Sequence, residues 1–196
     1  FITRPQPVSS ALGHHIMEGR WLRDHAFLDD TIDYWLDAPQ GDRLHKYSQW
    51  LPHAVWQRAL VTGDAAFAIA RLDTLADDHR RWAAERLRPD GLYWQYDVRD
   101  AMEESISGGR HAHNVRPTLN SYMAGSALAL AAIARHAGRD AEAEAFTAEG
   151  EGLREKLLAT LWNPRDEFFE VVREDGSFAN VREAVSYTHL TLPTKA

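Results

Sequence analysis

Four carboxylates lie close together in the middle of the sequence, directly after a group of aromatic residues. The carboxylates are Asp97, Asp100, Glu103 and Glu104, and the aromatic residues are Tyr93, Trp94 and Tyr96. Desolvation disfavours the charged form of a carboxyl group, so a carboxyl sheltered by aromatic rings has a raised pKa and can act as a general acid. Two such groups on opposite sides of a sugar can hydrolyse a glycosidic bond. A solvated acidic turn, with its aromatic rings packed into the scaffold, is the alternative.

The sequence is rich in tryptophan, with 7 among 196 residues. Indole rings have large flat apolar faces, on which the apolar faces of sugars can stack. Trp35 and Trp82 fall on the apolar stripes of predicted helices and are expected in the core. Trp50 and Trp94 lie beside polar residues near predicted helix ends, so we expect them to be the sugar platforms.

A second polar group, Arg116, Asn120 and Tyr122, surrounds the start of a predicted helix. Backbone N–H groups are unpaired at a helix start, so they and the side-chain amide could meet the hydroxyl groups of a ligand. The alternative is structural, with Thr118 capping the helix and Arg116 paired with a nearby acid.

The sequence indicates no metal or cofactor site. His14–His15 and the pair His111 and His113 lack the i, i+4 spacing of zincins, and the chain has no cysteine. Gly108–Gly109 is followed by no Walker-type lysine and is predicted to be a flexible loop. The formal net charge of -7 and the pI of about 5.8 give no indication of a nucleic-acid or membrane partner.

The remaining sequence has the apolar spacing of amphipathic helices, separated by short turns marked by glycine or proline. The predicted helices cover residues 24–38, 48–63, 64–88, 117–138 and 140–163. Ser48 is expected to cap the second and Asp64 to begin the third. Residues 1–19 are expected to be coil or the end of an element that begins upstream, and 168–172 a short strand. Connections this short favour antiparallel helical hairpins, and the fold class is therefore all-α, an incomplete toroid.

The two ends of the sequence do not have the features of natural termini. Residues 185–194, Val-Ser-Tyr-Thr-His-Leu-Thr-Leu-Pro-Thr, resemble the translation of a transposase sequencing adapter, and we expect 185–196 not to be native. A natural threonine-rich β-segment is the alternative. The chain begins at Phe1, so any signal peptide would lie upstream and the compartment is not indicated.

Several segments, in order along the chain, resemble the six-hairpin glycosidases. They are Gly-Leu-Tyr-Trp-Gln at 91–95, Asp-Ala-Met-Glu-Glu-Ser at 100–105, Arg-Pro-Thr-Leu-Asn-Ser-Tyr-Met at 116–123 and Leu-Trp-Asn-Pro at 161–164. The sequence is most similar to mannosylglycerate-hydrolase-like domains, akin to glycoside hydrolase family sixty-three and the trehalases. The resemblance covers nearly everything before residue 185, and it implies that residues 1–184 are part of an (α/α)6 toroid, truncated at both ends.

The resemblance also implies inverting hydrolysis of a carbohydrate by two carboxylic acids, without a cofactor. The family's general acid lies in a Ser-Gly-Met-Asp-Asn-Ser segment, and residues 100–105 match it with Glu103 at the acid's position. Glu103 is one methylene longer than the usual aspartate, and Asp100 and Asp97 are rival candidates. The general base is expected beyond the end of this sequence, so the chain alone is expected to be inactive.

The resemblance implies that a sugar pocket is lined by Trp94, Gln95, Arg116, Asn120 and Tyr122, and Trp50 is a further platform candidate. Two other classes of function remain open. One is a non-catalytic α-helical solenoid that binds a protein partner, which would need repeats of constant period. The other is a sugar epimerase or polysaccharide lyase on a related toroid, with His111, His113 or Tyr122 as the proton carrier.

Overall fold

The computed structural model of the chain describes residues 8–37, 41–100 and 105–182. Its helices are η1 (Ser9–Ala11), α1 (Leu12–Gly19), α2 (Ala26–Leu36), α3 (Gly41–Leu44), α4 (Leu51–Thr62), α5 (Ala65–Ile69), α6 (Leu72–Arg86), η3 (Asp97–Arg99), α7 (Pro117–His136) and α8 (Asp140–Leu161). Its strands are β1 (Trp94–Gln95), β2 (Asn114–Val115), β3 (Trp162–Asn163) and β4 (Phe168–Phe169). Within the described residues, none of these helices combines the length and the apolar character that crossing a lipid bilayer requires. The predicted all-α class is confirmed, whereas the predicted tail at 185–196 lies outside the described residues.

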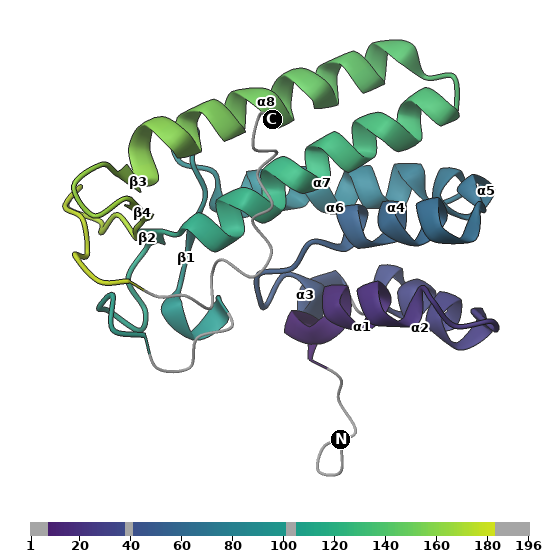
Figure 1. The fold of residues 1–196 in the computed structure, drawn as a ribbon, viewed down its shortest axis with the longest axis horizontal. Helices are drawn as coiled ribbons and strands as arrows, with labels where there is room; N and C mark the ends of the chain where they lie inside the picture. The colour runs from purple at the N-terminus through teal and green to yellow at the C-terminus, as the bar shows by residue number, and fades with distance from the viewer. Residues whose placement is uncertain (1–7, 38–40, 101–104, 183–196) are drawn as a thin grey trace.

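The helices form antiparallel hairpins that are stacked side by side (Figure 1). The hairpins are formed by α1 with α2, by α4 with α5 and α6, and by α7 with α8. Helices α1, α4 and α7 run in the same direction, with α4 packed between the other two. This arrangement of paired helices is that of a partial toroid, as expected. It places the amino-terminal ends of α4 and α7 on the same side of the molecule as β1 and β2.

Two apolar clusters fill the space between the helices. The larger contains the stripes of α1, α2, α4 and α6 together with the second half of α7, and it includes Trp35. The smaller contains Trp82 with residues of α7, α8 and the loop strands. Both tryptophans are therefore core residues, as predicted. Arg58 of α4 adds a buried two-pronged ion pair to α2, with its Nε and Nη2 atoms 2.7 and 2.6 Å from the carboxylate oxygens of Asp29.

Of the two alternatives for residues 1–19, coil is wrong for the described part of that stretch, which forms η1 and α1. Leu12 and Ile16 are one helical turn apart and both are buried. Gly13 lies between them, and a Cβ atom on Gly13 would lie only 1.6 Å from Nε1 of Trp50. Glycine is thus required here for close packing against α4, although it weakens the helical signal in the local sequence.

The helix predicted from Asp64 onwards is two helices, because the chain leaves helical geometry at Ala70–Arg71. The carboxylate of Asp64 caps the first by accepting a hydrogen bond from the Phe67 N–H group at 3.2 Å. The predicted apolar stripe nevertheless runs through both, with Ala68, Leu72, Leu75, His79 and Trp82 all buried. The cap predicted at Ser48 is wrong, since α4 starts three residues later and the Ser48 hydroxyl bonds elsewhere.

The sequence analysis did not predict the hairpin of β1 and β2, which pairs Trp94 with Val115 and Gln95 with Asn114. Val115 also pairs with Val172, which follows β4, so the segment after α8 braces the hairpin. The strand predicted at 168–172 is partly confirmed, as β4 covers its first two residues. The hairpin encloses residues 96–113, which we name the acidic loop, and leads directly into α7.

Candidate active site

The acidic loop carries the carboxylates that the sequence analysis selected, and it lies at the amino-terminal end of α7. Asp97 and Asp100 belong to the part of the loop before residue 101, which we call its first limb, and the part from residue 105 onwards is its second limb. Glu103, the predicted general acid, and Glu104 lie at 101–104, outside the described residues. The assignment of Glu103 as the general acid therefore stays a prediction.

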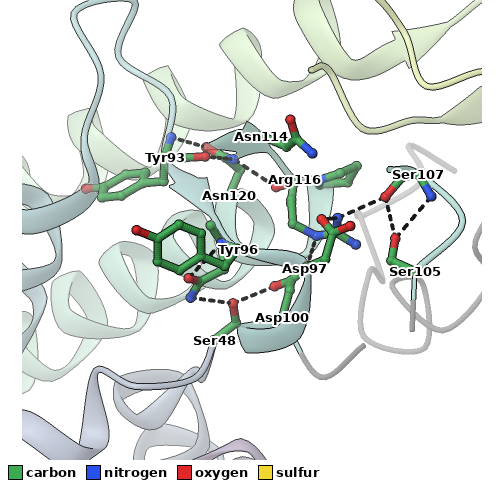
Figure 2. Close-up of polar contacts among 12 residues, drawn as sticks. Ser48, Tyr93, Tyr96, Asp97, Asp100, Ser105, Ser107, Asn114, Arg116 and Asn120 are labelled. Carbon is green, nitrogen blue, oxygen red and sulfur yellow. Dashed lines mark hydrogen bonds and ion pairs between the residues drawn. The ribbon is translucent and has the colours of Figure 1, made fainter. Parts of the chain in front are cut away.

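Arg116 lies at the centre of the site, with its side chain fully removed from solvent. Its Nε donates to Oδ2 of Asp100 at 2.7 Å, and its Nη1 donates to Oδ1 of Asp97 at 2.5 Å. The same Nη1 lies 3.0 Å from the hydroxyl of Ser107, on the second limb (Figure 2). A planar guanidinium can hold several acceptors at once in this way, and a buried charge needs such pairing.

The second carboxylate oxygen of Asp100 is the start of a longer hydrogen-bonded chain. The Ser48 hydroxyl, just before α4, donates to Oδ1 of Asp100 at 2.5 Å, and the Gln95 amide lies 3.3 Å from that hydroxyl. Gln95 in turn accepts from Nη1 of Arg86 at 2.6 Å. These hydrogen bonds together connect α6, β1, the segment before α4, the first limb and α7. A network that is satisfied along its length in this way holds its members rigidly.

Burial raises the pKa of Asp100, while the positive charge of Arg116 and the hydrogen bond from Ser48 act in the opposite direction. Burial also raises the pKa of the Tyr122 hydroxyl, and the nearby charge of Asp100 raises it further. Tyr122 therefore keeps its proton near neutral pH and can donate a hydrogen bond, but it is poorly suited to remove a proton from a sugar.

Asn120 is held by the backbone of the preceding hairpin. Its Oδ1 accepts from the Tyr93 N–H group and its Nδ2 donates to the Tyr93 carbonyl oxygen, both at 2.8 Å. Nδ2 also donates to the carbonyl oxygen of Arg116 at 2.8 Å. Gln95, Arg116 and Asn120, which were expected to line a sugar pocket, are thus buried and bonded to protein groups in this structure.

Trp94 is half-buried and is covered by two side chains. The His113 ring stacks on it at a centroid distance of 3.7 Å and an angle of 22°, and the guanidinium carbon of Arg86 lies 4.4 Å from its ring centroid. In this structure Trp94 is part of an aromatic and cationic stack.

Trp50 and Tyr122 come together at the amino-terminal ends of α4 and α7, with ring centroids 4.6 Å apart in an edge-to-face arrangement. The His14 ring of α1 lies 5.0 Å from Trp50. Trp50 is 6% exposed and Tyr122 is half-buried. Trp50 follows Ser48 by two residues, and the Ser48 hydroxyl bonds to Asp100, so the ring pair lies on the Asp100 side of the Arg116 cluster.

The histidines of the acidic loop surround Tyr96 and do not form a ligand set. Nε2 of His113 lies 3.1 Å from the Tyr96 hydroxyl, and the His111 ring is 5.9 Å from the Tyr96 ring. Within residues 8–37, 41–100 and 105–182, no group of three or more potential ligand side chains is placed to hold a metal ion.

Ser48, Arg86 and Ser107 are parts of the site that were not predicted from the sequence. Ser48 and Asp100 are 52 residues apart, and no local pattern connects them. Arg173, which follows β4, also reaches the second limb, donating from its Nε to the Ser107 carbonyl oxygen at 3.2 Å. The only indication of these site residues in the sequence was the presence of polar residues beside Trp50 and Trp94.

Paired helices in a partial toroid, with a buried acidic and aromatic cluster at the amino-terminal ends of two parallel helices, define a domain of the helical-toroid glycosidase class. The chain belongs to the family of mannosylglycerate hydrolase MGH1-like glycoside hydrolase domains, whose model matches residues 4–196. The resemblance inferred from the sequence is thereby confirmed.

Among solved structures, the chain is similar to a protein titled sialidase, with 41% sequence identity and a TM-score of 0.89. The match covers 94% of this chain and 17% of that protein, so the chain spans about a sixth of its length. No curated protein matches the chain at a significant level.

Proposed function

We propose that the chain is part of a glycoside hydrolase that cleaves the O-glycosidic bond of a small glycoside or oligosaccharide with inversion. The family supports hydrolysis of a carbohydrate. The observation that carries the proposal is the position of the acidic loop, whose first limb is fixed by Arg116 and is bonded to Ser48, two residues before Trp50 of the Trp50–Tyr122 pair. Acid catalysis needs a carboxyl group held close to an apolar sugar-binding surface, and this arrangement provides the scaffold for one.

Glu103 is the general acid in this proposal. A general acid must reach the departing oxygen of the sugar, and a fully buried carboxylate whose oxygens accept hydrogen bonds from protein groups is poorly placed to do so. Asp97 and Asp100 both receive hydrogen bonds from Arg116, and Asp100 receives another from Ser48. Their pairing supports a structural role for both, so that Glu103, three residues after Asp100, is the better candidate for protonating the leaving group.

Tyr122, packed against the buried ring of Trp50, is the proposed sugar contact. It can donate a hydrogen bond to a sugar because its hydroxyl stays protonated, and the exposed part of its ring can pack against the sugar. The raised pKa of Tyr122 also argues against the epimerase or lyase alternative that would use it as a base. The second carboxylate of the inverting pair is proposed to lie outside this sequence, so the isolated chain is expected to show no turnover.

The test uses the full-length protein that contains this domain. A panel of 4-nitrophenyl α- and β-glycosides of glucose, mannose and galactose identifies the sugar, and a 4-methylumbelliferyl sialoside is added because the similar structure is titled sialidase. Proton NMR of the first anomer released distinguishes inversion from retention. Glu103→Gln is expected to lower kcat by about 10²- to 10⁴-fold, the usual contribution of a general acid, with substrate still bound.

Glu104→Gln is the matched control, because it removes the same charge one position further along the loop. It should retain a kcat within about a factor of ten of the parent, since only Glu103 is proposed to donate the proton. An unchanged rate for Glu103→Gln, or a product of retained configuration, would contradict the proposal. Robust hydrolysis by the present 196-residue chain would contradict the placement of the second carboxylate outside it.

A further inference from the structure

A groove with a volume of about 420 Å³ lies between α6 and α8. Its apolar walls include Ala83 of α6 and Leu87 just after that helix, with Leu153 of α8 on the other side. Gly152 of α8 leaves space in it, because a Cβ atom on this residue would meet no atom within 4 Å. The groove therefore has the volume and the apolar walls that are usual for a small-molecule site.

The groove carries opposite charges on one face of α8. Glu149 and Lys156 both line it, and residues seven apart in a helix share a face and lie about 10 Å apart along its axis. Oε1 of Glu149 lies 2.8 Å from Nε2 of the buried His79, whereas its Oε2 has no hydrogen-bonding partner among the residues that the structure describes. The Lys156 ammonium likewise has none within the described part of the chain, and it lies over the turn at Gly91. Both charged groups can therefore bind a ligand.

The hydroxyl of Tyr93 is the third polar group of the groove. Tyr93 is only 2% exposed, and its hydroxyl makes no hydrogen bond to any residue that the structure describes, although a buried tyrosine usually has a partner. Its backbone is fixed by Asn120, and its ring points away from Arg116 (Figure 2). Burial and the negative charge of Glu149 raise the pKa of this hydroxyl, so it keeps its proton. A hydrogen-bond donor without a partner is thus held at the wall of the groove.

We propose that this groove binds a short peptide, with the peptide's ammonium group at Glu149, its carboxylate at Lys156 and one of its amide carbonyl groups at the Tyr93 hydroxyl. Three extended residues span about 10 Å, which matches the separation of the two charges, whereas the two ends of a single amino acid are too close together to reach both. Each terminus meets a charge of opposite sign, and this complementarity selects a zwitterion over an uncharged sugar. The site is separate from the proposed hydrolysis and does not depend on it.

Isothermal titration calorimetry of the full-length protein with triglycine tests the proposal, and we expect saturable binding at one site. Glu149→Gln and Lys156→Gln should each raise the Kd by about tenfold, since each removes a hydrogen bond to a charged group. Tyr93→Phe, which removes only the hydroxyl, should raise it by about three- to tenfold. Glu144→Gln and Lys46→Gln are the matched controls, because they remove the same charges from exposed residues that do not line the groove. They should leave the Kd unchanged.

Modified peptides test the same contacts without changing the protein. N-Acetyltriglycine lacks the ammonium group, so it should bind the parent about tenfold more weakly than triglycine does but should bind Glu149→Gln equally well. Triglycine amide lacks the carboxylate and should show the same pattern with Lys156→Gln.

Three results would overturn the proposal. The first is the absence of saturable triglycine binding, and the second is a Kd that is the same for all three peptides or unaffected by Glu149→Gln and Lys156→Gln. The third concerns the uncharged sugar maltotriose. If it binds more tightly than triglycine and depends on the Tyr93 hydroxyl but on neither charge, the groove is a sugar site instead.

Discussion

Asn120 pairs with both backbone polar groups of Tyr93, much as a neighbouring strand would. The amide oxygen accepts from the Tyr93 N–H group and the amide nitrogen donates to its carbonyl oxygen, each at 2.8 Å. Because Tyr93 immediately precedes β1 and Asn120 lies in the first turn of α7, this side chain joins the start of the hairpin to the helix that ends it.

Replacing Asn120 with alanine should lower the free energy of unfolding by about 2–6 kcal/mol. The substitution leaves two buried backbone groups of Tyr93 without partners, at about 1–3 kcal/mol for each unsatisfied group. Urea unfolding monitored by circular dichroism measures the loss. Ser121→Ala is the control, because the Ser121 hydroxyl donates only to the Pro117 carbonyl oxygen one turn earlier, and it should change stability by less than about 0.5 kcal/mol. Equal effects for the two variants would show that the Asn120 bridge is unimportant.

Gly13→Ala should destabilise the protein by about 1–3 kcal/mol, the usual cost of overpacking. The new methyl group would overlap the Trp50 indole, so Trp50 or α1 has to move. Gly152→Ala on α8 is the control, since a Cβ there meets no atom within 4 Å, and it should stabilise the helix by about 0.5–1 kcal/mol. Thermal unfolding and tryptophan fluorescence together measure both effects. An unchanged tryptophan emission spectrum together with an unchanged Tm in Gly13→Ala would refute the close contact.

Asp29→Ala should lower the free energy of unfolding by about 3 kcal/mol. The substitution leaves Arg58 buried without its two-pronged partner, and breaking a buried pair costs about 3–5 kcal/mol, less where one member keeps contact with solvent as Asp29 does. Asp77→Ala, which breaks the exposed pair of Asp77 and Arg80, is the comparison and should cost less than about 1 kcal/mol. A similar loss in both variants would show that burial of the Arg58 pair does not matter.

His53 of α4 should make the protein less stable as the pH falls below about 6.5. Burial lowers the pKa of His53, and the positive charge of Arg20 lowers it further, although a hydrogen bond with the Gly125 backbone acts in the opposite direction. The unfolded chain therefore binds a proton at a pH where the folded protein does not, and stability rises with pH across that window. His53→Gln should lose less stability than the parent between pH 7 and pH 5 in urea unfolding. An identical pH dependence would contradict this role.

The helices predicted best from the sequence are those in which one uninterrupted helix carries the whole apolar stripe. The stripe of α7, with Leu119, Met123 and Leu130, is buried as expected, and so is that of α8. Helix α1 was missed because its short apolar repeat contains Gly13, whose purpose is to make room for Trp50 of another helix. The break between α5 and α6 was missed because the apolar spacing continues through it without a change of phase.

For the site, the sequence identified the residue types but could not show how they pair. It placed Asp97, Asp100 and Arg116 in one functional region, and the structure brings these three side chains together. The pairing of Arg116 with a nearby acid was one of two alternatives and is confirmed, but the sequence did not show that Arg116 binds both aspartates, or that Ser48 reaches Asp100 from 52 residues away. Such contacts depend on how distant helices pack, and periodicity within one segment carries no information about them.

The contacts from the segment after α8 have a consequence for protein engineering. Val172 bonds to the backbone of Val115, and Arg173 bonds to the carbonyl oxygen of Ser107, so two neighbouring residues support both β2 and the second limb. Exchanging residues 96–113 alone between family members would separate that loop from the segment after β4 that supports it. A chimera intended to transfer specificity should carry residues 168–179 together with the loop as one cassette.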